Sequence, residues 1–140
     1  MGGLSSGKVI IENNNNRKYY RMVGNVTTEN NGGFIQMRVE IKPSIPSNSY
    51  QGVYLETFGN MFKYAIHIRT PYTKLPWQYY SSKFTAKNKW EKIKLPFNNF
   101  KKSNFYQPKN LSNQKIKSIG LVAAFENFKA DICLAKIGLY

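Results

Sequence analysis

The strongest constraint on the fold is a series of short strand-like segments between Gly32 and Phe100. Glycine, proline or asparagine separates these segments, and within each one apolar residues alternate with polar residues or run together. A period of two indicates a strand with one buried face, whereas an amphipathic helix repeats about every 3.6 residues. No segment shows convincing helical periodicity. The pattern therefore predicts an all-β protein, a β-sandwich of the jelly-roll type.

We expect about nine strands in one domain that spans residues 1–140. Pro43 and Pro46 should end the third strand, because proline cannot donate a ladder hydrogen bond. Gly59-Asn60 is typical of a tight hairpin turn, and Asn98–Gln114 should be a loop. The expected strands are Lys8–Ile11, Tyr19–Val26, Phe34–Ile41, Gly52–Phe58, Lys63–Thr70, Tyr79–Phe84, Trp90–Leu95, Lys115–Ala124 and Ala130–Tyr140.

The charge is strongly positive, with 21 lysines and arginines against seven acids and a formal net charge of +14. A field of this sign attracts polyanions, which include nucleic acid, anionic lipid surfaces and acidic protein partners. Of the 21 cations, 17 are lysine, and asparagine is also abundant. A compositional bias towards lysine and asparagine explains the charge equally well. Dispersed lysine is also a weaker sign of nucleic-acid binding than clustered arginine.

The single cysteine, Cys133, excludes an internal disulfide framework. It lies in the apolar run ADICLAKI and should behave as a small core residue, which fits a reducing compartment. No stretch approaches the roughly 18 apolar residues of a membrane-spanning helix. No secretory signal is present either. The expected location is the cytoplasm, with peripheral contact to a membrane as one alternative.

Catalytic chemistry finds little support in the residue pattern. The one histidine, His67, lies in mid-strand between Ile66 and Ile68, and a lone histidine on a strand is usually a packed or surface residue. The seven acids form no cluster with the spacing of metal ligands. No phosphate-binding glycine loop or nucleophile elbow is present. We therefore predict no catalytic residue, no metal site and no cofactor. Glu40 and Glu56 could form a glycosidase-like pair, but only their presence supports it.

A set of polar residues projects away from the apolar faces of three expected strands. If these strands are neighbours, the residues share one polar sheet face. One interpretation is a solvated face held by cross-strand ion pairs of about 0.2–1 kcal/mol each. The other is a binding surface on which paired arginines grip an acidic group. The residues concerned are Arg38, Glu40, Tyr54, Glu56, His67 and Arg69.

A second candidate binding element is the aromatic segment Trp77, Tyr79 and Tyr80. Aromatic side chains at loop edges can stack on sugar rings or nucleic-acid bases. The alternative is packing at the rim of the sandwich. Trp90 is expected in the core or as its lid, because the spacing of Trp90, Ile93 and Leu95 alternates towards a buried face.

The segments taken together resemble the CIA30 domain, the domain of complex I intermediate-associated protein 30. The resemblance runs over nearly the whole chain and rests on the order and spacing of its motifs. The motifs are GGFIQMR, QGVYLETFGN with KYAIHIRT, YYSSKF, WEKIKLPFNNF and IKSIGL. The family pattern also contains Met-Gly-Gly-x-Ser after an acidic stretch, which Met1–Ser5 matches. The resemblance thus implies that the domain begins upstream of Met1.

The resemblance implies a galactose-binding-like β-sandwich that lacks a cofactor. It also implies an assembly or chaperone-like role for respiratory complex I, NADH:ubiquinone oxidoreductase, through contacts with protein subunits. In a eukaryote the location would be the mitochondrial matrix. Arg38 and Arg69 are the matched positions whose chemistry exceeds packing. The matched positions expected to be structural are Gly33, Phe34, Gly59, Tyr64, Trp90, Pro96, Phe97 and Phe100.

The sequence departs from the family pattern at two places. The hairpin that usually reads Gly-Asp is Gly59-Asn60 here, which removes a charge. The usual Arg-Gly is missing around Phe105-Tyr106. Two other functions stay open at this point. A carbohydrate-binding module would use Trp77, Tyr79 and Tyr80, and a domain that binds RNA or an anionic surface would use the charge, with steep salt dependence.

Overall fold

The computed structural model describes residues 6–28, 33–75, 77–111, 114–124 and 126–140. Within these ranges it contains ten strands and two three-residue 3₁₀ helices, and no helix there is long and apolar enough to span a bilayer. The strands are β1 (Ser6–Asn14), β2 (Arg17–Val26), β3 (Ile35–Pro46), β4 (Gly52–Phe58), β5 (Lys63–Arg69), β6 (Tyr80–Thr85), β7 (Glu91–Pro96), β8 (Lys101–Lys102), β9 (Lys115–Ala123) and β10 (Phe128–Leu139). The 3₁₀ helices are η1 (Ser47–Ser49) and η2 (Phe97–Asn99).

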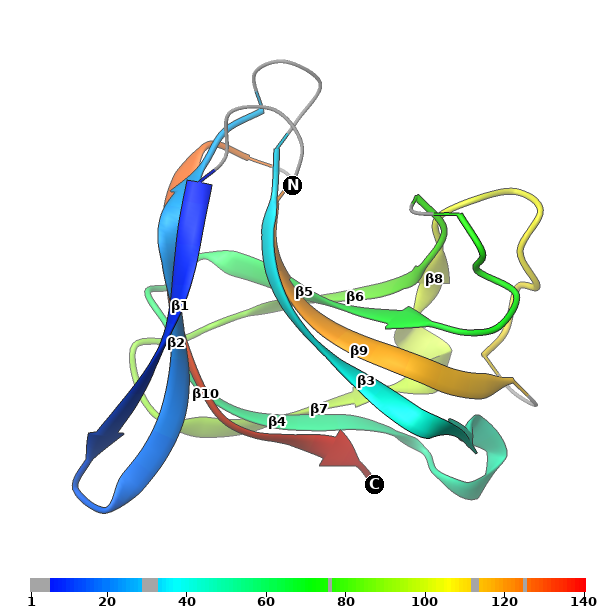
Figure 1. Cartoon of the computed structure of the whole chain (residues 1–140), viewed down its shortest axis with the longest axis horizontal. Helices are drawn as coiled ribbons and strands as arrows, with labels where there is room; N and C mark the ends of the chain where they lie inside the picture. Colours follow the sequence, from blue (N-terminus) through cyan, green and yellow to red (C-terminus); the bar gives the residue numbers. More distant parts are fainter. Residues whose placement is uncertain (1–5, 29–32, 76, 112–113, 125) are drawn as a thin grey trace.

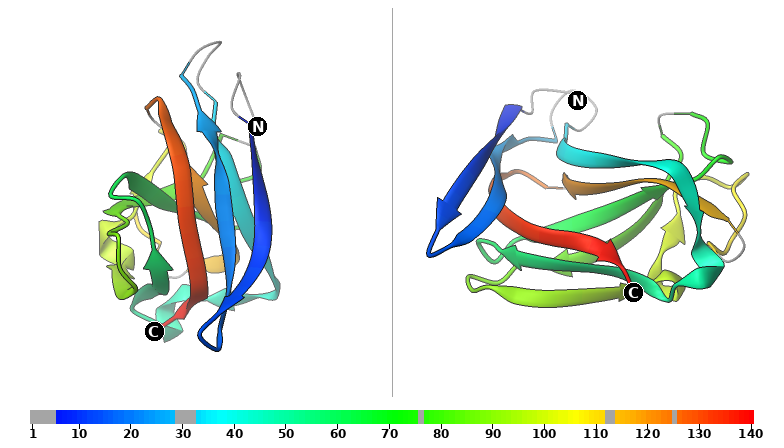
Figure 2. Two further views of the ribbon diagram at one scale, coloured as in Figure 1. Left: turned by 90° about the vertical axis from the view of Figure 1, so that its left-hand side faces the viewer. Right: turned by 60° about the horizontal axis from the view of Figure 1, so that its bottom comes forward.

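The strands form two antiparallel sheets that lie face to face (Figures 1 and 2). The first sheet has the order β1-β2-β10-β4-β7, and the second has the order β3-β9-β5-β6-β8. Strands distant in sequence lie side by side in both sheets, since β10 enters between β2 and β4 and β9 enters between β3 and β5. The predicted all-β sandwich is confirmed.

The core lies between the two sheets and follows from the alternation of each strand. In β5, Tyr64, Ile66 and Ile68 are fully buried, as their period of two predicted. Leu55 of β4 and Ile132 of β10 meet them from the first sheet with no exposed surface. Burying an aliphatic side chain of this size contributes about 1.5–3 kcal/mol. The inner faces therefore hold the sheets together and leave the outer faces free for polar residues.

Two predictions about segment boundaries were wrong. Pro43 does not end the third strand, because β3 continues to Pro46 with a register shift between Glu40 and Ile45. Among the described residues β3 ends its sheet, and an edge strand tolerates a residue that has no backbone N–H. The expected loop over residues 98–114 contains β8, which pairs with the start of β6. The motif at residues 1–5 falls outside the described residues.

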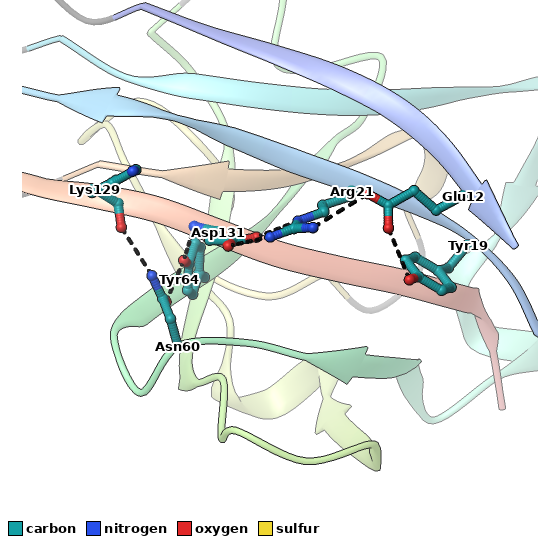
Figure 3. Close-up of polar contacts among 7 residues, drawn as sticks. All are labelled: Glu12, Tyr19, Arg21, Asn60, Tyr64, Lys129 and Asp131. Atoms are coloured by element: carbon teal, nitrogen blue, oxygen red, sulfur yellow. Dashed lines mark hydrogen bonds and ion pairs between the residues drawn. The ribbon is translucent and has the colours of Figure 1, made fainter. Parts of the chain in front are cut away.

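The outer face of the first sheet carries a polar row across three strands (Figure 3). The guanidinium of Arg21 on β2 binds both carboxylate oxygens of Asp131 on β10, at 2.8 and 2.7 Å, and lies 3.3 Å from Glu12 on β1. The hydrogen bond to Asp131 is the main reason why the pKa of Arg21 rises. Cys133 is a buried free thiol, as expected, and burial raises its pKa to about 11.

The hairpin turn between β4 and β5 is tied to β10 by a buried tyrosine hydroxyl (Figure 3). Tyr64 donates to Asn60 Oδ1 at 2.7 Å and accepts the backbone N–H of Asp131 at 2.9 Å. Asn60 also donates through Nδ2 to the carbonyl of Lys129 at 2.9 Å. An aspartate could not make this last bond, so the Asn60 amide offers a donor that the usual Gly-Asp hairpin would lack. Gly59 packs against Ala86 too closely for any Cβ.

The hydroxyl of Tyr64 should contribute measurably to stability. Tyr64→Phe removes both hydrogen bonds and leaves the N–H of Asp131 without that acceptor, which should cost about 1–3 kcal/mol. Urea unfolding followed by circular dichroism measures the change. Tyr72→Phe is the matched control, because Tyr72 is exposed. Equal stability of the Tyr64 and Tyr72 variants would show that the buried link contributes nothing.

Candidate functional site

A cleft of about 570 Å³ lies over the outer face of the second sheet. Its floor is β9, and its walls come from β3 on one side and from β5 with the following loop on the other. This loop, coloured green, stands at the right-hand side of the second sheet in Figure 1. The cleft is lined by Thr28, Gly33, Phe34, Gln36, Arg38, His67, Arg69, Trp77, Tyr79, Ser118, Gly120, Val122 and Ala124.

The face is hollow because the central strand carries only small residues on it. Ser118, Gly120 and Val122 face the cleft from β9, whereas the neighbouring strands present longer side chains. Arg38 and His67 both pair with Gly120 in the ladder, so they stand on opposite sides of a residue without a side chain. A Cβ on Gly120 would lie 3.4 Å from Gln36 Oε1, an ordinary contact. Glycine here leaves space for a ligand and is not required by the backbone.

His67 forms part of an aromatic wall. Its ring stacks on that of Tyr79 with centroids 3.9 Å apart and planes 9° from parallel. Burial lowers the pKa of His67 to about 4, since an imidazolium at this position would lose its hydration. At neutral pH His67 is therefore uncharged, and the positive charge of the described lining comes from the arginines alone.

Arg69 positions the loop that carries Trp77. Its guanidinium donates to the carbonyls of Thr73 at 2.8 Å and Leu75 at 3.0 Å. From the other side, Ser103 Oγ donates to the carbonyl of Trp77 at 2.8 Å. The loop is thus held at both ends, and it leaves the Trp77 side chain 58% exposed at the cleft. An exposed indole that is held in place offers a flat surface for a ligand.

Arg38 lies on the opposite rim and is only loosely engaged. Its nearest acid is Glu40, with Nη2 and Oε1 3.5 Å apart, and both side chains are largely exposed. Exposed pairs of this kind contribute about 0–1 kcal/mol. A ligand carboxylate that binds the guanidinium in a bidentate manner can therefore replace Glu40 at little cost.

Five of the seven binding candidates expected from the sequence come together in this cleft, namely Arg38, His67, Arg69, Trp77 and Tyr79. Tyr54 does not join them, because β4 belongs to the first sheet. The assumption that three consecutive strands are neighbours was wrong, since β9 separates β3 from β5. Tyr54 and Glu56 instead lie on the outer face of the other sheet, where Lys92 stands 4.8 Å from the Tyr54 ring.

Tyr80 is also misplaced by the sequence analysis. Its side chain is fully buried, and its hydroxyl is hydrogen-bonded to the Pro108 carbonyl and to Gln114. Neighbouring residues of a strand face opposite sides, so Tyr79 points to the cleft and Tyr80 to the core.

Trp90 is half-buried and covers the outer side of the first sheet, with its ring 5.2 Å from Tyr19 and the guanidinium of Arg17 at 4.4 Å.

Sequence reasoning missed the floor of the cleft. The signal was present as small residues at every second position from Ser118 to Ala124, a pattern that predicts a hollow on one face. Gly33 and Phe34, expected to be structural, also line the cleft. Pro96 ends β7, and Phe97 of η2 packs against the core beside Phe100, which is buried.

The chemistry of the lining favours non-covalent binding. The described lining contains two guanidinium groups, an exposed indole, a glutamine and hydroxyls, and it contains neither a carboxylate nor a thiol. Elsewhere in the described ranges no three His, Cys, Asp or Glu residues gather as a metal site would require. These donors suit a ligand that presents acidic or hydroxyl groups.

The buried imidazole predicts a pH dependence of stability. The unfolded chain takes up a proton on His67 near pH 6.5 and the folded protein only near pH 4, so stability falls as the pH drops through this window. The variant His67→Phe retains a flat ring but cannot take up this proton. Between about pH 7.5 and about pH 5 the free energy of unfolding of the wild type should fall by about 2 kcal/mol relative to this variant. Urea unfolding at both values measures this difference. A constant difference would contradict a neutral, buried His67.

Several solved structures share the fold. The family 11 carbohydrate-binding module of the cellulosomal cellulase Lic26A-Cel5E of Clostridium thermocellum has a TM-score of 0.76 and 16% identity, over 99% of this chain and 83% of that one. A structure of the Clostridium thermocellum module in complex with a β-1,3-1,4-mixed-linked tetrasaccharide has the same score and identity, with 84% of that chain covered. A family 30 carbohydrate-binding module has a TM-score of 0.67 and 11% identity, over 99% and 92% of the two chains. These similarities establish the galactose-binding-like sandwich fold, and they do not identify a ligand of this chain.

None of the curated proteins matches the chain. The model of one protein family does match, over residues 1–134, and that family is described as complex I intermediate-associated protein 30. The match covers almost the whole chain and agrees with the motif order noted above. The chain therefore belongs to the CIA30 family.

Proposed function

We propose that this chain is a non-enzymatic binding domain of the assembly-factor type and that the cleft on the second sheet holds a protein subunit, of respiratory complex I where the host has one. The observation that carries the proposal is the lining itself. Arg38 and Arg69 stand on opposite rims with the exposed Trp77 at one end, and the lining residues that the structure describes include no carboxylate. The family match over residues 1–134 supports the same class of role.

The two arginines and Trp77 are residues of the kind that dominate protein interfaces. Arginine and tryptophan are enriched among side chains that carry most of the binding free energy. A guanidinium also recognises a carboxylate through two parallel hydrogen bonds. An acidic loop of a subunit would therefore place its carboxylate near Arg38 and an apolar side chain against Trp77. We further propose a cytoplasmic or matrix location beside the membrane, where the net charge of +14 favours anionic lipid.

The first test is capture of partners from the native host. Tagged wild-type protein should enrich NADH:ubiquinone oxidoreductase subunits in complexes that survive high salt and nuclease, as identified by mass spectrometry. The double variant Arg38→Ala, Trp77→Ala should lose them, and Lys87→Ala, at an exposed turn, should retain them. Partners that vanish with nuclease or salt would instead indicate RNA or an anionic surface. Capture of no complex I subunit would contradict the proposal.

A bulky side chain at the floor offers a test that leaves every proposed contact intact. Gly120→Leu fills the space between Arg38 and His67 and should reduce partner capture at least tenfold by steric exclusion. Gly120→Ala adds one methyl at ordinary contact distance and should reduce capture much less. Both proteins should fold, because strands accept side chains at this face, and circular dichroism checks this. Undiminished capture by Gly120→Leu would place the partner elsewhere.

A carbohydrate-binding function is the second candidate. The observation that favours it is Trp77, whose exposed ring lies at a cleft in a fold shared with carbohydrate-binding modules. Affinity electrophoresis in mixed-linked β-1,3-1,4-glucan should then retard the wild type and not Trp77→Ala. Tyr80 does not enter this test, because it is buried. Equal mobility of the wild type with and without glucan would show that the protein does not bind this glucan.

A further inference from the structure

An apolar groove of about 520 Å³ opens between the two sheets at one side of the sandwich, at a different place from the cleft. Among the described residues β1 ends the first sheet and β3 ends the second. The two strands are close at one end, where a Cβ on Gly7 would lie 3.0 Å from Ile35. Towards the other end they diverge, and in Figure 1 β1 runs to the lower left whereas β3 runs to the lower right. The inner faces of both sheets are therefore uncovered there.

The uncovered residues point inwards but are exposed. Val39 of β3 is 47% exposed, although it shares its face with the buried Ile35. On the opposite wall Val9 is 43% and Tyr20 is 50% exposed. Val9 pairs with the buried Met22, and Tyr20 pairs with the buried Leu134, so both belong to the core side of the first sheet. Strands normally expose their polar side, so this arrangement suggests a surface that another chain covers.

The shape of β10 explains why the groove forms. β10 pairs with β2 only as far as Leu134, and a register shift between Leu134 and Lys136 turns its remaining residues towards β4 alone. The tip of the hairpin β1–β2, residues 12–14 and 17–19, therefore extends beyond the pairing with β10, as the right-hand view of Figure 2 shows. A two-stranded hairpin is marginally stable by itself. Further pairing and apolar contact would stabilise this tip.

The rim of the groove is basic. Arg38 and Lys136 line it. In an adjoining hollow Lys136 is joined by Arg17, Lys18 and one acid, Glu56, which is its ladder partner. Within the part of the chain that the structure describes, neither lysine forms an ion pair. On β3 Glu40 already faces two cations, Arg38 and Lys42, so cations outnumber acids among the described residues around the groove. The charge around the apolar floor thus favours an occupant with negative ends.

We propose that this groove binds an extended segment of a partner protein, with apolar residues at alternate central positions and acidic residues at its ends, which adds as a strand to the free edge of β3. The first six residues of β3, from Ile35 to Glu40, pair regularly with β9 and span about 20 Å. A strand at the free edge would have its main-chain groups bound by β3. Its inward side chains would enter the groove between Val39 and Leu134.

A second copy of this chain fits the groove less well. It would bring another net charge of +14 to a basic rim, and like charges repel at this distance. An anionic bilayer would satisfy the rim, but a flat surface cannot enter a groove between two sheets. An acidic segment satisfies both the charge and the shape. Gln36 and Arg38 line both surfaces, but the inference does not depend on what the cleft binds, because Val39 and Val9 are not among the cleft residues.

The experiment is selection from a displayed library of random nine-residue peptides against the wild-type domain. Library members that also bind Val39→Asp are removed, and fluorescence anisotropy measures the affinities of the peptides that remain. We expect them to alternate apolar residues between acidic ends. Their affinity should fall at least tenfold with Val39→Asp and with Val9→Asp. Phe105→Asp should bind normally, because Phe105 is also exposed, at 84%, but lies outside the groove.

Two further readouts separate strand addition from other contact. Amide hydrogen exchange at residues 35–40 should slow when a selected peptide binds, which contact with side chains alone would not cause. Lys136→Glu should weaken the same peptides, whereas Lys87→Glu should not. Thermal melts verify that the variants fold, and two independent substitutions on opposite walls guard against a local effect.

Four outcomes would overturn the proposal. The first is a selection that yields no peptide dependent on Val39, and the second is a set of selected peptides that are basic. The third is binding of phosphatidylserine vesicles that Val39→Asp abolishes while no peptide binds, which would assign the groove to a membrane. The fourth is a dimer in sedimentation that Val39→Asp dissociates, which would assign it to a second copy.

Discussion

The inward row of β5 is the constraint on which the rest of the structure depends. Tyr64, Ile66 and Ile68 have no exposed surface, and a shift by one residue would bring His67 and Arg69 into the core instead. An unpaired guanidinium in an apolar core costs far more than any cross-strand contact returns. The register of β5 is therefore fixed by burial, and with it the outward direction of the two side chains that form one wall of the cleft.

The cleft then depends on which strand lies beside β5. Because β9 enters between β3 and β5, a strand from the end of the chain supplies the floor and strands from the middle supply the walls. Ser118 and Gly120 would be ordinary small residues in any other position. Between the longer side chains of β3 and β5 they create depth. The site is thus a product of long-range topology acting on residues that carry no chemistry of their own.

This distinction explains what the sequence could predict. The faces of β4 and β5 were predicted correctly, because alternation along a strand is local and burial enforces it. The neighbours of each strand were not, and Tyr54 and Glu56 were placed beside Arg38 when they lie on the other sheet. Tyr80 was taken for an exposed ring because aromatic residues suit either face of a strand. The continuation of β3 through Pro43 depends on its edge position, which no local pattern reveals.

The two binding surfaces share one strand. Met37 and Val39 of β3 line the groove alone, whereas Gln36 and Arg38 line both the groove and the cleft. Its one described neighbour is β9, so its edge is less constrained than the central strands. A partner strand on that edge would restrict the backbone from which Arg38 projects, and so lower the entropy that Arg38 loses on binding a carboxylate. Occupation of the groove would thereby favour occupation of the cleft, and by reciprocity the cleft would favour the groove.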